Sequence, residues 1–426
     1  YSQKTVNGIA YYLGNDSGIT HTWTDTTVTN GQLYYYAVCA YDYGYEPADE
    51  DSAMIFPSEN AITVSRTPRG GLILPKNVVM LRPEPRVGGY VPASAEEVVH
   101  VAGDGTGAVG VEVVNSTIVP DGHLFRLGFL TQYPDSVHAD WYELRDSTDH
   151  VTLFSRGTDF DGLGAGPTAS GLLPVVKTHE KSYPDSMVSA WREGSATNVR
   201  FYSFYTGALS ANRRRIGFPD DLTIVFDSAF VDTGETWGGI PARPAKFRIY
   251  ARTDSGDVQL RFRFRDLRVD GTLDSLGEWV EVICSGPVVR IDSLVTWRIQ
   301  LDPRGATGRP AVVPPTLGDV YDLVICRPLN VSDVYVFGTD GERVDASAEG
   351  ALVAGKPYVV PNPYVGSASF EPARFAESGR GERRIEFRDL PLGATVRIYT
   401  VRGDLVRTLR QDGSVQAYVA WELRTK

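Results

Sequence analysis

The most constraining feature of the sequence is a stretch in which apolar and charged residues alternate without a break. It reads Leu260-Arg261-Phe262-Arg263-Phe264-Arg265. Because successive side chains of a β-strand point to opposite faces, this stretch predicts a strand with one apolar face and one face of guanidinium groups. Further strand patterns occur at 222–226, 247–250, 297–301 and 321–325. Sustained helical periodicity is nearly absent, so the sequence predicts an all-β protein.

Composition favours several antiparallel β-sandwich domains. Of the 426 residues, 42% are hydrophobic, 43 are glycine and 26 are proline. This hydrophobic content is ample for packed cores, and abundant glycine and proline are typical of many short strands joined by tight turns. We expect roughly three or four domains at this length.

The middle of the chain divides by composition into a linker and two sandwiches. Residues 68–92 are rich in proline and glycine, which predicts an extended, weakly folded linker. A first central sandwich is expected over residues 93–181, with a hairpin around Asp146–Asp149. A second and larger sandwich is expected over residues 182–352. The boundary between the two is open, because they could also form one composite domain.

Residues 1–67 contain a recognisable strand pattern. It has the form G-x-x-Y-x-Y-x-V-x-A and is carried by Gly31, Tyr34, Tyr36, Val38 and Ala40. The pattern resembles strand F of fibronectin type III domains, with Tyr34 as the tyrosine of the corner between strands E and F. The resemblance implies that Tyr34, Tyr36 and Val38 face a core. Because the sequence before Trp23 is too short for the preceding strands, we expect a partial domain.

Residues 353–426 contain four short motifs in a fixed order. They are V-V-P-N-P-Y at 359–364, F-R-D-L-P at 387–391, V-R-I-Y-T-V-R-G-D-L-V at 396–406 and W-E-L at 421–423. Together they resemble the immunoglobulin-like C-terminal domains of large secreted bacterial proteins, the group that includes type IX secretion sorting domains and the flagellar-hook-cap Ig-like domain. The resemblance implies a small antiparallel β-sandwich on a secreted or cell-surface protein. Members of the group continue past the W-x-L motif with further strands, which are missing here.

Both terminal domains are therefore expected to lack strands. An open sheet edge is a template for a strand from another chain, so one hypothesis is that neighbouring subunits complete one another by strand addition into a head-to-tail polymer. The alternative is that the sequence is the ordered or cloned part of a longer polypeptide. The absence of a signal peptide and of an initiator methionine is interpreted as an N-terminus made by processing or truncation.

Charge and hydropathy exclude some functions. A net charge of −11 argues against a general nucleic-acid or anionic-membrane binder, because such binding relies on a basic field. No apolar run approaches the roughly 20 residues needed to cross a bilayer, so no transmembrane segment is expected.

The three cysteines predict neither a disulfide framework nor a zinc site, because they are odd in number and far apart. Cys39, Cys284 and Cys326 each lie within an apolar strand pattern, which favours buried free thiols. A bridge between Cys284 and Cys326 stays open for an exported protein.

Two acidic segments are weak calcium candidates. Asp159 and Asp161, followed by Gly162, resemble part of a calcium loop, but the full D-x-D-x-D-G run with a later glutamate is missing. The alternative for these residues, and for the acidic loop at 46–51, is a solvated surface loop. No cofactor other than this calcium ion is expected.

Arginines and one tryptophan are candidates for an interface or a glycan site. Arg261, Arg263 and Arg265, and the triplet at 213–215, are able to bind an anionic polysaccharide or a neighbouring subunit. The alternative is cross-strand pairing with carboxylates on a solvated face. Trp237 lies between small residues in an expected loop, where its ring either stacks on a sugar or an interface, or folds back to cap the sandwich.

The sequence contains no catalytic motif that we recognise. Its six histidines are scattered, and neither a nucleophile elbow nor a phosphate-binding glycine loop occurs. We therefore expect a non-catalytic extracellular or cell-surface structural protein, such as a subunit of a filament, sheath or stalk, that associates with itself or with other surface proteins. The alternative function is a carbohydrate-binding or accessory region of a large secreted hydrolase.

Overall fold

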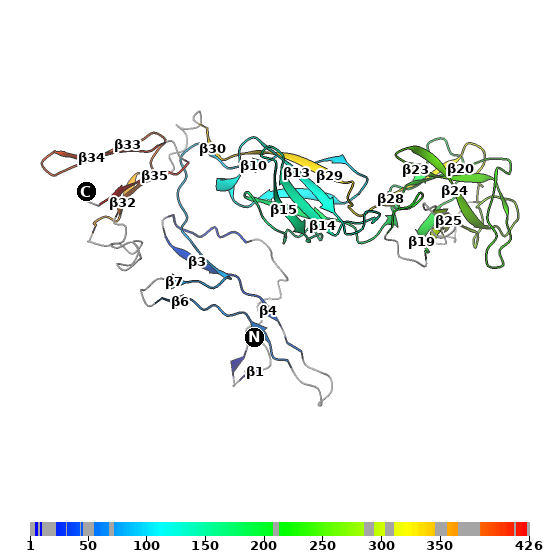
Figure 1. Cartoon of the computed structure of the whole chain (residues 1–426), viewed down its shortest axis with the longest axis horizontal. Coiled ribbons are helices and arrows are strands. Elements are labelled where there is room, and N and C mark those ends of the chain that lie inside the picture. The colour runs from blue at the N-terminus through cyan, green and yellow to red at the C-terminus, as the bar shows by residue number, and fades with distance from the viewer. Residues whose placement is uncertain are drawn as a thin grey trace. The chain divides into compact units, whose positions relative to one another are not determined.

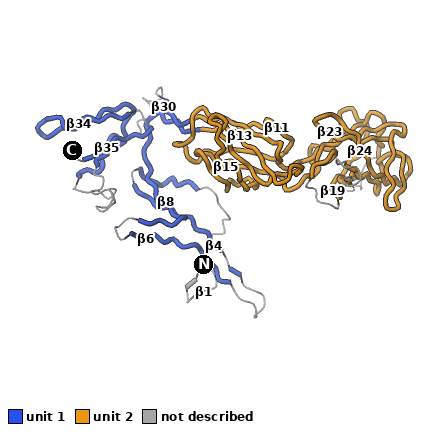
Figure 2. The backbone as a smooth tube through the Cα atoms, viewed as in Figure 1, with its two compact units in different colours: residues 1–93, 341–426 blue, residues 94–340 orange. Residues whose placement is uncertain are grey.

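The computed structural model describes most of the chain. The described residues are 5–6, 9–10, 23–30, 32–42, 44–45, 55–67, 72–207, 213–284, 294–302, 311–345, 356–364, 384–412 and 415–423. Within them the chain consists of antiparallel strands and one short 3-10 helix, η1 (Ser116–Ile118), which confirms the all-β prediction (Figure 1). The chain divides into unit 1, residues 1–93 and 341–426, and unit 2, residues 94–340 (Figure 2).

Unit 2 begins with a small sandwich. Its larger sheet has the order β10-β29-β13-β14-β15, and β11 also pairs with β29. The bounds are β10 (Ser94–Ala95), β11 (Val99–Ala102), β13 (His123–Leu130), β14 (Trp141–Asp146), β15 (Val151–Gly157) and β29 (Val334–Asp340). A second sheet pairs β12 (Ala108–Val113) with β16 (Leu172–Lys177). Buried side chains from both sheets, among them Leu127, Tyr142 and Val176, form one core, so the sheets pack face to face. The predicted hairpin is confirmed by the pairing of β14 with β15.

The strand β29 departs from the order expected from sequence. The expected division assigned residues 182–352 to the larger sandwich, whereas β29 pairs with β13 in the small one, with Phe125 opposite Phe337. In Figure 1 this yellow strand lies beside the cyan β13. The rings of Phe125 and Phe337 stack with centroids 5.3 Å apart. The larger sandwich is thus an insertion within the smaller one.

The large sandwich is one curled sheet with the order β18-β27-β20-β23-β24-β25-β26-β19. The bounds are β18 (Ala190–Trp191), β19 (Phe201–Tyr205), β20 (Leu222–Phe226), β23 (Phe247–Thr253), β24 (Gly256–Arg265), β25 (Trp279–Cys284), β26 (Leu294–Leu301) and β27 (Val320–Leu323). Each strand pattern identified in the large sandwich from the sequence lies on one of these strands or on β28 (Ile325–Cys326), which follows β27.

Strand β24 turns the sheet back on itself. Its first half pairs with β23, up to Leu260 opposite Ile249, and its second half pairs with β25, from Arg261 onward. Leu260, Phe262 and Phe264 point into the core and are 2%, 1% and 1% exposed. The predicted alternation is confirmed, and the intervening arginines lie on the outer face.

Two short ladders complete unit 2. One pairs β21 (Asp232–Thr233) with β22 (Pro244–Ala245). The other pairs β17 (Tyr183–Pro184) with β28, where the chain enters and leaves the large sandwich. The two connections between the sandwiches therefore run side by side as hydrogen-bonded strands.

Unit 1 contains small sheets. Its ladders are β1 (Thr5–Val6) with β2 (Ile9–Ala10), β3 (Tyr34–Ala37) with β8 (Val78–Leu81), β4 (Tyr41–Asp42) with β5 (Ser58–Glu59), β6 (Ser65–Arg66) with β7 (Leu72–Ile73), and β9 (Tyr90–Val91) with β30 (Arg343–Val344). The C-terminal part has a three-stranded sheet β31-β32-β35 and a hairpin β33-β34. The bounds of these strands are β31 (Tyr358–Val360), β32 (Arg384–Arg388), β33 (Thr395–Tyr399), β34 (Leu405–Arg410) and β35 (Tyr418–Glu422).

The expectation that Tyr34, Tyr36 and Val38 face a core holds only in part. The hydroxyl of Tyr34 accepts a hydrogen bond of 2.8 Å from the backbone N–H of Thr29, a bond back to the preceding chain like that of a tyrosine corner. Tyr34 and Tyr36 are half-buried. Val38, however, is 78% exposed, so the expectation that it faces a core is wrong. The strand ends at Ala37, and the alternation of faces does not continue beyond it.

The expected linker is folded over much of its length. Besides supplying β8 and β9, it runs along the C-terminal part of unit 1, where the N–H of Val87 donates to Val415 O and the N–H of Ala417 donates to Pro85 O, both at 3.0 Å. Glu84 also pairs with the buried guanidinium of Arg388 at 2.7 Å. Residues of this segment therefore belong to the core of unit 1 in place of forming a weakly folded connection.

The three cysteines are free thiols. Cys284 is buried as expected, whereas Cys39 is exposed and Cys326 is half-buried, so burial was wrongly expected for Cys39. The open alternative of a bridge between Cys284 and Cys326 is not formed in this structure.

Candidate functional site

Trp237 is presented by a tight turn on the large sandwich. Its backbone exchanges two hydrogen bonds with Ile240, of 3.0 and 2.8 Å. Gly238 and Gly239 between them have φ of +49° and +85°. Two successive residues of positive φ form the turn that matches the twist of a hairpin, and glycine adopts it without steric cost. The turn leaves the Trp237 side chain 41% exposed.

Arg263 connects this tryptophan to the sheet. Its guanidinium carbon lies 3.9 Å from the centroid of the Trp237 ring, a close cation–π contact. On the other side, Arg263 is 3.6 Å from the carboxylate of Glu281, which stands directly opposite it on β25. Burial lowers the pKa of Arg263, while Glu281 and Glu235 oppose that shift.

Glu281 joins a second arginine on the same row. This carboxylate is 7% exposed and accepts bonds of 3.1 and 2.5 Å from Nε and Nη2 of Arg298 on β26. The Arg298 guanidinium lies 4.6 Å from the ring centroid of Trp279 and 5.9 Å from that of Phe204 on β19. Trp237, Arg263, Glu281, Arg298 and Trp279 therefore form a continuous chain of contacts, which we call the Trp–Arg–Glu–Arg–Trp ladder.

A groove of about 530 Å³ lies along this ladder. All five residues of the ladder line it, together with Thr206, Gly238, Ile240, Leu294 and Val295. The lining combines flat aromatic rings, charged nitrogen donors and a few aliphatic side chains. Such a groove offers stacking and ionic contacts to one ligand at the same time.

The other two arginines of the predicted row flank the ladder. Arg261 pairs with Glu235 at 2.7 Å, so the cross-strand and local pairing considered from sequence is present for Arg261 and Arg263. Arg265 is exposed and stands opposite Trp279 in the sheet register. Trp237 and Arg263 are thus brought together, with Arg261 and Arg265 on either side of Arg263 along the same face.

The calcium candidates are held by their own loop. The carboxylate of Asp159 accepts the N–H of Ala165 at 2.6 Å, and that of Asp161 accepts the N–H of Leu163 at 2.7 Å. Among the described residues, they are not part of a group of three converging His, Cys, Asp or Glu ligands. The acidic loop at 46–51 lies outside the described residues.

The group of such ligands found in the described part of the chain consists of His123, Asp146 and Asp149. Asp146 is occupied by protein donors: it accepts from His123 at 2.7 Å and from the N–H groups of Thr148 and Asp149 at 2.9 and 3.1 Å. The bond to Asp146 raises the pKa of His123 above its usual value. This cluster closes the β14–β15 turn.

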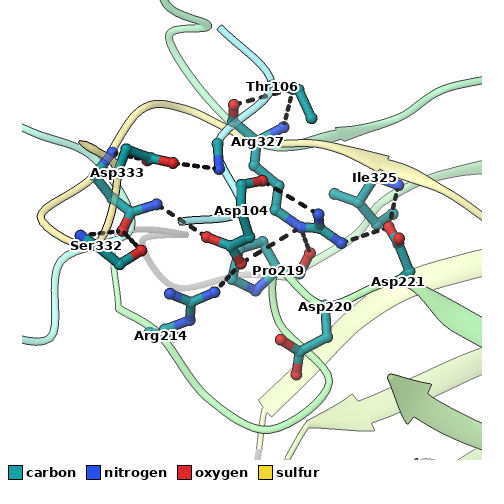
Figure 3. A network of polar contacts seen from close by, with 12 residues as sticks. Asp104, Thr106, Arg214, Pro219, Asp220, Asp221, Ile325, Arg327, Ser332 and Asp333 are labelled. Carbon is teal, nitrogen blue, oxygen red and sulfur yellow. Dashed lines mark hydrogen bonds and ion pairs between the residues drawn. The ribbon is translucent and has the colours of Figure 1, made fainter. Parts of the chain in front are cut away.

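A second polar network lies where the two sandwiches of unit 2 meet (Figure 3). Arg327, on the segment that returns from the large sandwich, donates to Pro219 O at 2.9 Å and to Asp104 O at 3.3 Å. Its Nη2 also lies 2.5 Å from the carboxylate of Asp221. Asp104 in turn binds Arg214 from the large sandwich.

The network borders a cleft of about 860 Å³. Figure 3 shows Asp220 beside the network, and burial raises its pKa. The cleft lining includes Arg214, Arg215, Arg252 and Arg327 as well as Asp104, Asp220, Asp221 and Asp254. In the arginine triplet at 213–215, Arg214 is engaged with Asp104 and Arg213 lies 3.6 Å from Asp135, so the alternative of pairing with carboxylates is present for these two residues. The cleft lining has as many aspartates as arginines, so it has no excess of positive charge for an anion. The ion pairs around it join the two sandwiches.

Trp279, Glu281 and Arg298 were not recognised as site residues from the sequence. All three lie on predicted or strongly apolar strands at outward positions, but only the register of β24, β25 and β26 places Glu281 opposite both Arg263 and Arg298, and Trp279 opposite Arg265. A charged residue flanked by apolar ones, as in Val280-Glu281-Val282, was the signal available.

Comparisons with protein-family models, with curated proteins and with solved structures found no match. In the part of the chain that the structure describes, no helix is long and apolar enough to cross a membrane.

Proposed function

We propose that this chain is a non-catalytic structural protein of an extracellular or cell-surface assembly, such as a filament, sheath or stalk. The observation that carries the proposal is the exposure of apolar side chains on the small sheets of unit 1. Two-stranded sheets are marginal in water when they stand alone, so such sheets gain stability from added strands.

The β3–β8 ladder illustrates this exposure. Tyr35 and Met80 stand opposite each other and are 47% and 44% exposed, and Leu81 is 51% exposed. The hairpin β33–β34 is similar, with Tyr399 at 54% and Leu405 at 56%. Within the described residues each of these ladders has two strands and so presents open edges. An open apolar edge favours pairing with a strand from a neighbouring subunit.

The two resemblances noted in the sequence support the same proposal. Residues of the C-terminal motifs form strands in the expected places, with Phe387 on β32 opposite Val419 on β35 and Val396 on β33 opposite Leu409 on β34. Tyr34 makes the bond of a tyrosine corner. Immunoglobulin-like and fibronectin-like modules are common in secreted and cell-surface proteins, which favours an extracellular location.

Unit 2 contributes the properties of a stiff spacer. Its two sandwiches are joined by two connections that pair as β17 and β28, and Arg327 clamps the junction. Bending such a junction breaks ladder hydrogen bonds and ion pairs, whereas a single flexible linker bends freely. A stiff double-linked spacer suits a load-bearing filament or stalk.

Electron microscopy of the purified native protein, with the intact mass of its subunit, tests the proposal. We expect filaments or regular arrays. A double variant, Met80→Lys with Val406→Lys, places a charge on each exposed ladder and should leave single particles. Leu163→Lys, at a loop position that is 59% exposed, is the matched control and should still assemble. Monodisperse wild-type particles at all concentrations would count against a structural polymer.

A further inference from the structure

We propose that the groove along the Trp–Arg–Glu–Arg–Trp ladder binds an anionic polysaccharide built from uronic acids. This inference goes beyond the structural role proposed above. The groove lies on the outer face of the large sandwich, whereas the structural role depends on the sheets of unit 1, so either proposal can fail without the other. It rests on the aromatic surface, the local charge and the order already present in the side chains.

The aromatic surface suits sugar rings. Trp237 keeps 41% of its surface exposed although Arg263 stacks on it, and Trp279 lies further along the same groove. The flat apolar face of a pyranose packs on an indole, while the hydroxyl groups of the sugar remain free for water or polar side chains. Two tryptophans in one groove allow more than one sugar of a chain to be bound.

The local charge is opposite to that of the whole protein. Among the described side chains named above for this face, four are arginines and two are glutamates, which leaves an excess of positive charge; they are Arg261, Arg263, Arg265, Arg298, Glu235 and Glu281. The protein as a whole carries −11. A positive groove on an acidic protein attracts the anionic groups of a ligand locally, and the two tryptophans add stacking to that attraction.

The two carboxylates position the arginines without occupying them fully. Glu281 binds Arg298 through two nitrogens but lies 3.6 Å from Arg263, so the latter keeps donors for a ligand. Among the described residues no carboxylate partner is found for Arg265, which is exposed opposite Trp279. A uronate ring stacked in the groove therefore finds guanidinium donors at its rim, and a planar fork of this kind binds a carboxylate with two parallel hydrogen bonds.

The ladder also lowers the cost of binding. Arg263 lies 3.9 Å from the ring centroid of Trp237, and Arg298 lies 4.6 Å from that of Trp279. Glu281 contacts both arginines, so their rotamers are fixed before a ligand arrives. Ordering free long side chains opposes association, and a preorganised site avoids that loss.

Isothermal titration calorimetry of the full chain with three glycans tests the proposal. The probes are polyuronate oligosaccharides from alginate, dextran sulfate as a sulfate-bearing chain, and neutral dextran. We expect binding of the polyuronate that weakens as salt rises, and no binding of dextran. Trp279→Ala should lower the affinity about tenfold or more, as expected for loss of one stacking partner.

Trp141→Ala is the matched control. Trp141 lies on the small sandwich with the guanidinium of Arg156 5.3 Å above its ring, so the substitution removes a similar pair away from the groove and should leave affinity unchanged. Arg265→Glu changes an exposed side chain and is the second variant, used if circular dichroism shows that Trp279→Ala does not fold. It should also lower affinity about tenfold.

Three results would overturn the proposal. They are the absence of polyuronate binding, equal affinities for wild type, Trp279→Ala and Arg265→Glu, and equal losses in Trp141→Ala and Trp279→Ala. Binding of dextran sulfate without binding of polyuronate would assign the groove to sulfate esters and would also overturn the assignment to uronic acids. Assembly seen by microscopy has no bearing on these outcomes, so failure of the structural proposal is recognised separately.

Discussion

Replacing Arg327 by methionine should destabilise unit 2 by about 3 kcal/mol, because it leaves acceptors at the junction without their charged donor. The Arg327 side chain is 12% exposed, and methionine preserves much of its apolar stem. The variant loses the 2.5 Å ion pair with Asp221 and the hydrogen bonds to Pro219 O and Asp104 O.

The magnitude follows from the burial of these partners. Breaking a buried ion pair from one side costs about 3 to 5 kcal/mol, because the remaining charge stays desolvated. The carboxylate of Asp221 is 27% exposed and keeps the hydrogen bond of 2.8 Å from the N–H of Ile325, so we expect the lower end of this range. For a unit of this size, a loss of about 3 kcal/mol lowers Tm by roughly 6 to 12 °C when the two sandwiches unfold together.

Differential scanning calorimetry of the full chain measures the effect. The matched control is Arg213→Met, since the Arg213 side chain is 64% exposed and lies 3.6 Å from Asp135, whose side chain is 51% exposed. Such surface pairs contribute less than about 1 kcal/mol, so the control should shift Tm by only a few degrees. If Arg327→Met lowers Tm no more than Arg213→Met does, the network in Figure 3 does not brace the junction and the reasoning fails.

Three further predictions concern single side chains. Phe262→Ala should cost about 3 to 5 kcal/mol in urea unfolding, because the ring is 1% exposed in the core; a loss below about 1 kcal/mol would mean that the core is loosely packed. The hydrogen bond to Asp146 raises the pKa of His123, so its stabilising contribution is full below the unfolded pKa of about 6.5 and is lost as pH rises through the folded pKa. The urea midpoint should therefore fall above pH 6.5 in the wild type and fall less in His123→Gln, and equal pH profiles would contradict the assignment. In the native protein a thiol reagent should modify Cys39 quickly and Cys284 only on unfolding, because burial raises the pKa of Cys284; mass spectrometry of the labelled protein decides.

Several strands, among them β20, β23, β24 and β26, could be predicted from the sequence, because each shows the side-chain period of a strand. The alternation around Phe262 fixed which residues of β24 face the core and which face solvent, and the structure agrees. Trp237 was recognised as a site candidate since it precedes two glycines in a turn. Such local patterns therefore show which side chains of a strand face the core and which face solvent.

The pairing partner of each strand could not be predicted in the same way, because a period-two pattern fits any neighbouring strand equally well. Strand β29 pairs with β13, although the sequence places it directly after the large sandwich. For the same reason Glu281 and Arg298 were not joined to Arg263: their contact follows from the register of three strands. The expected linker was misjudged because proline and glycine permit folded edge segments as well as free connections, and Glu84 and Val87 secure this one.

The insertion of one sandwich inside the other constrains the order in which the chain can fold. Strand β29 completes the sheet of the small sandwich next to β13, yet Thr339 and His123 are 216 positions apart in the sequence. During synthesis β13, β14 and β15 emerge long before β29, so the sheet of the small sandwich stays incomplete while the inserted domain is made. Once that domain has folded, the β17–β28 ladder holds its two ends together and shortens the loop that β29 must close. We therefore expect the inserted sandwich to fold before the sheet of the surrounding domain is completed by β29.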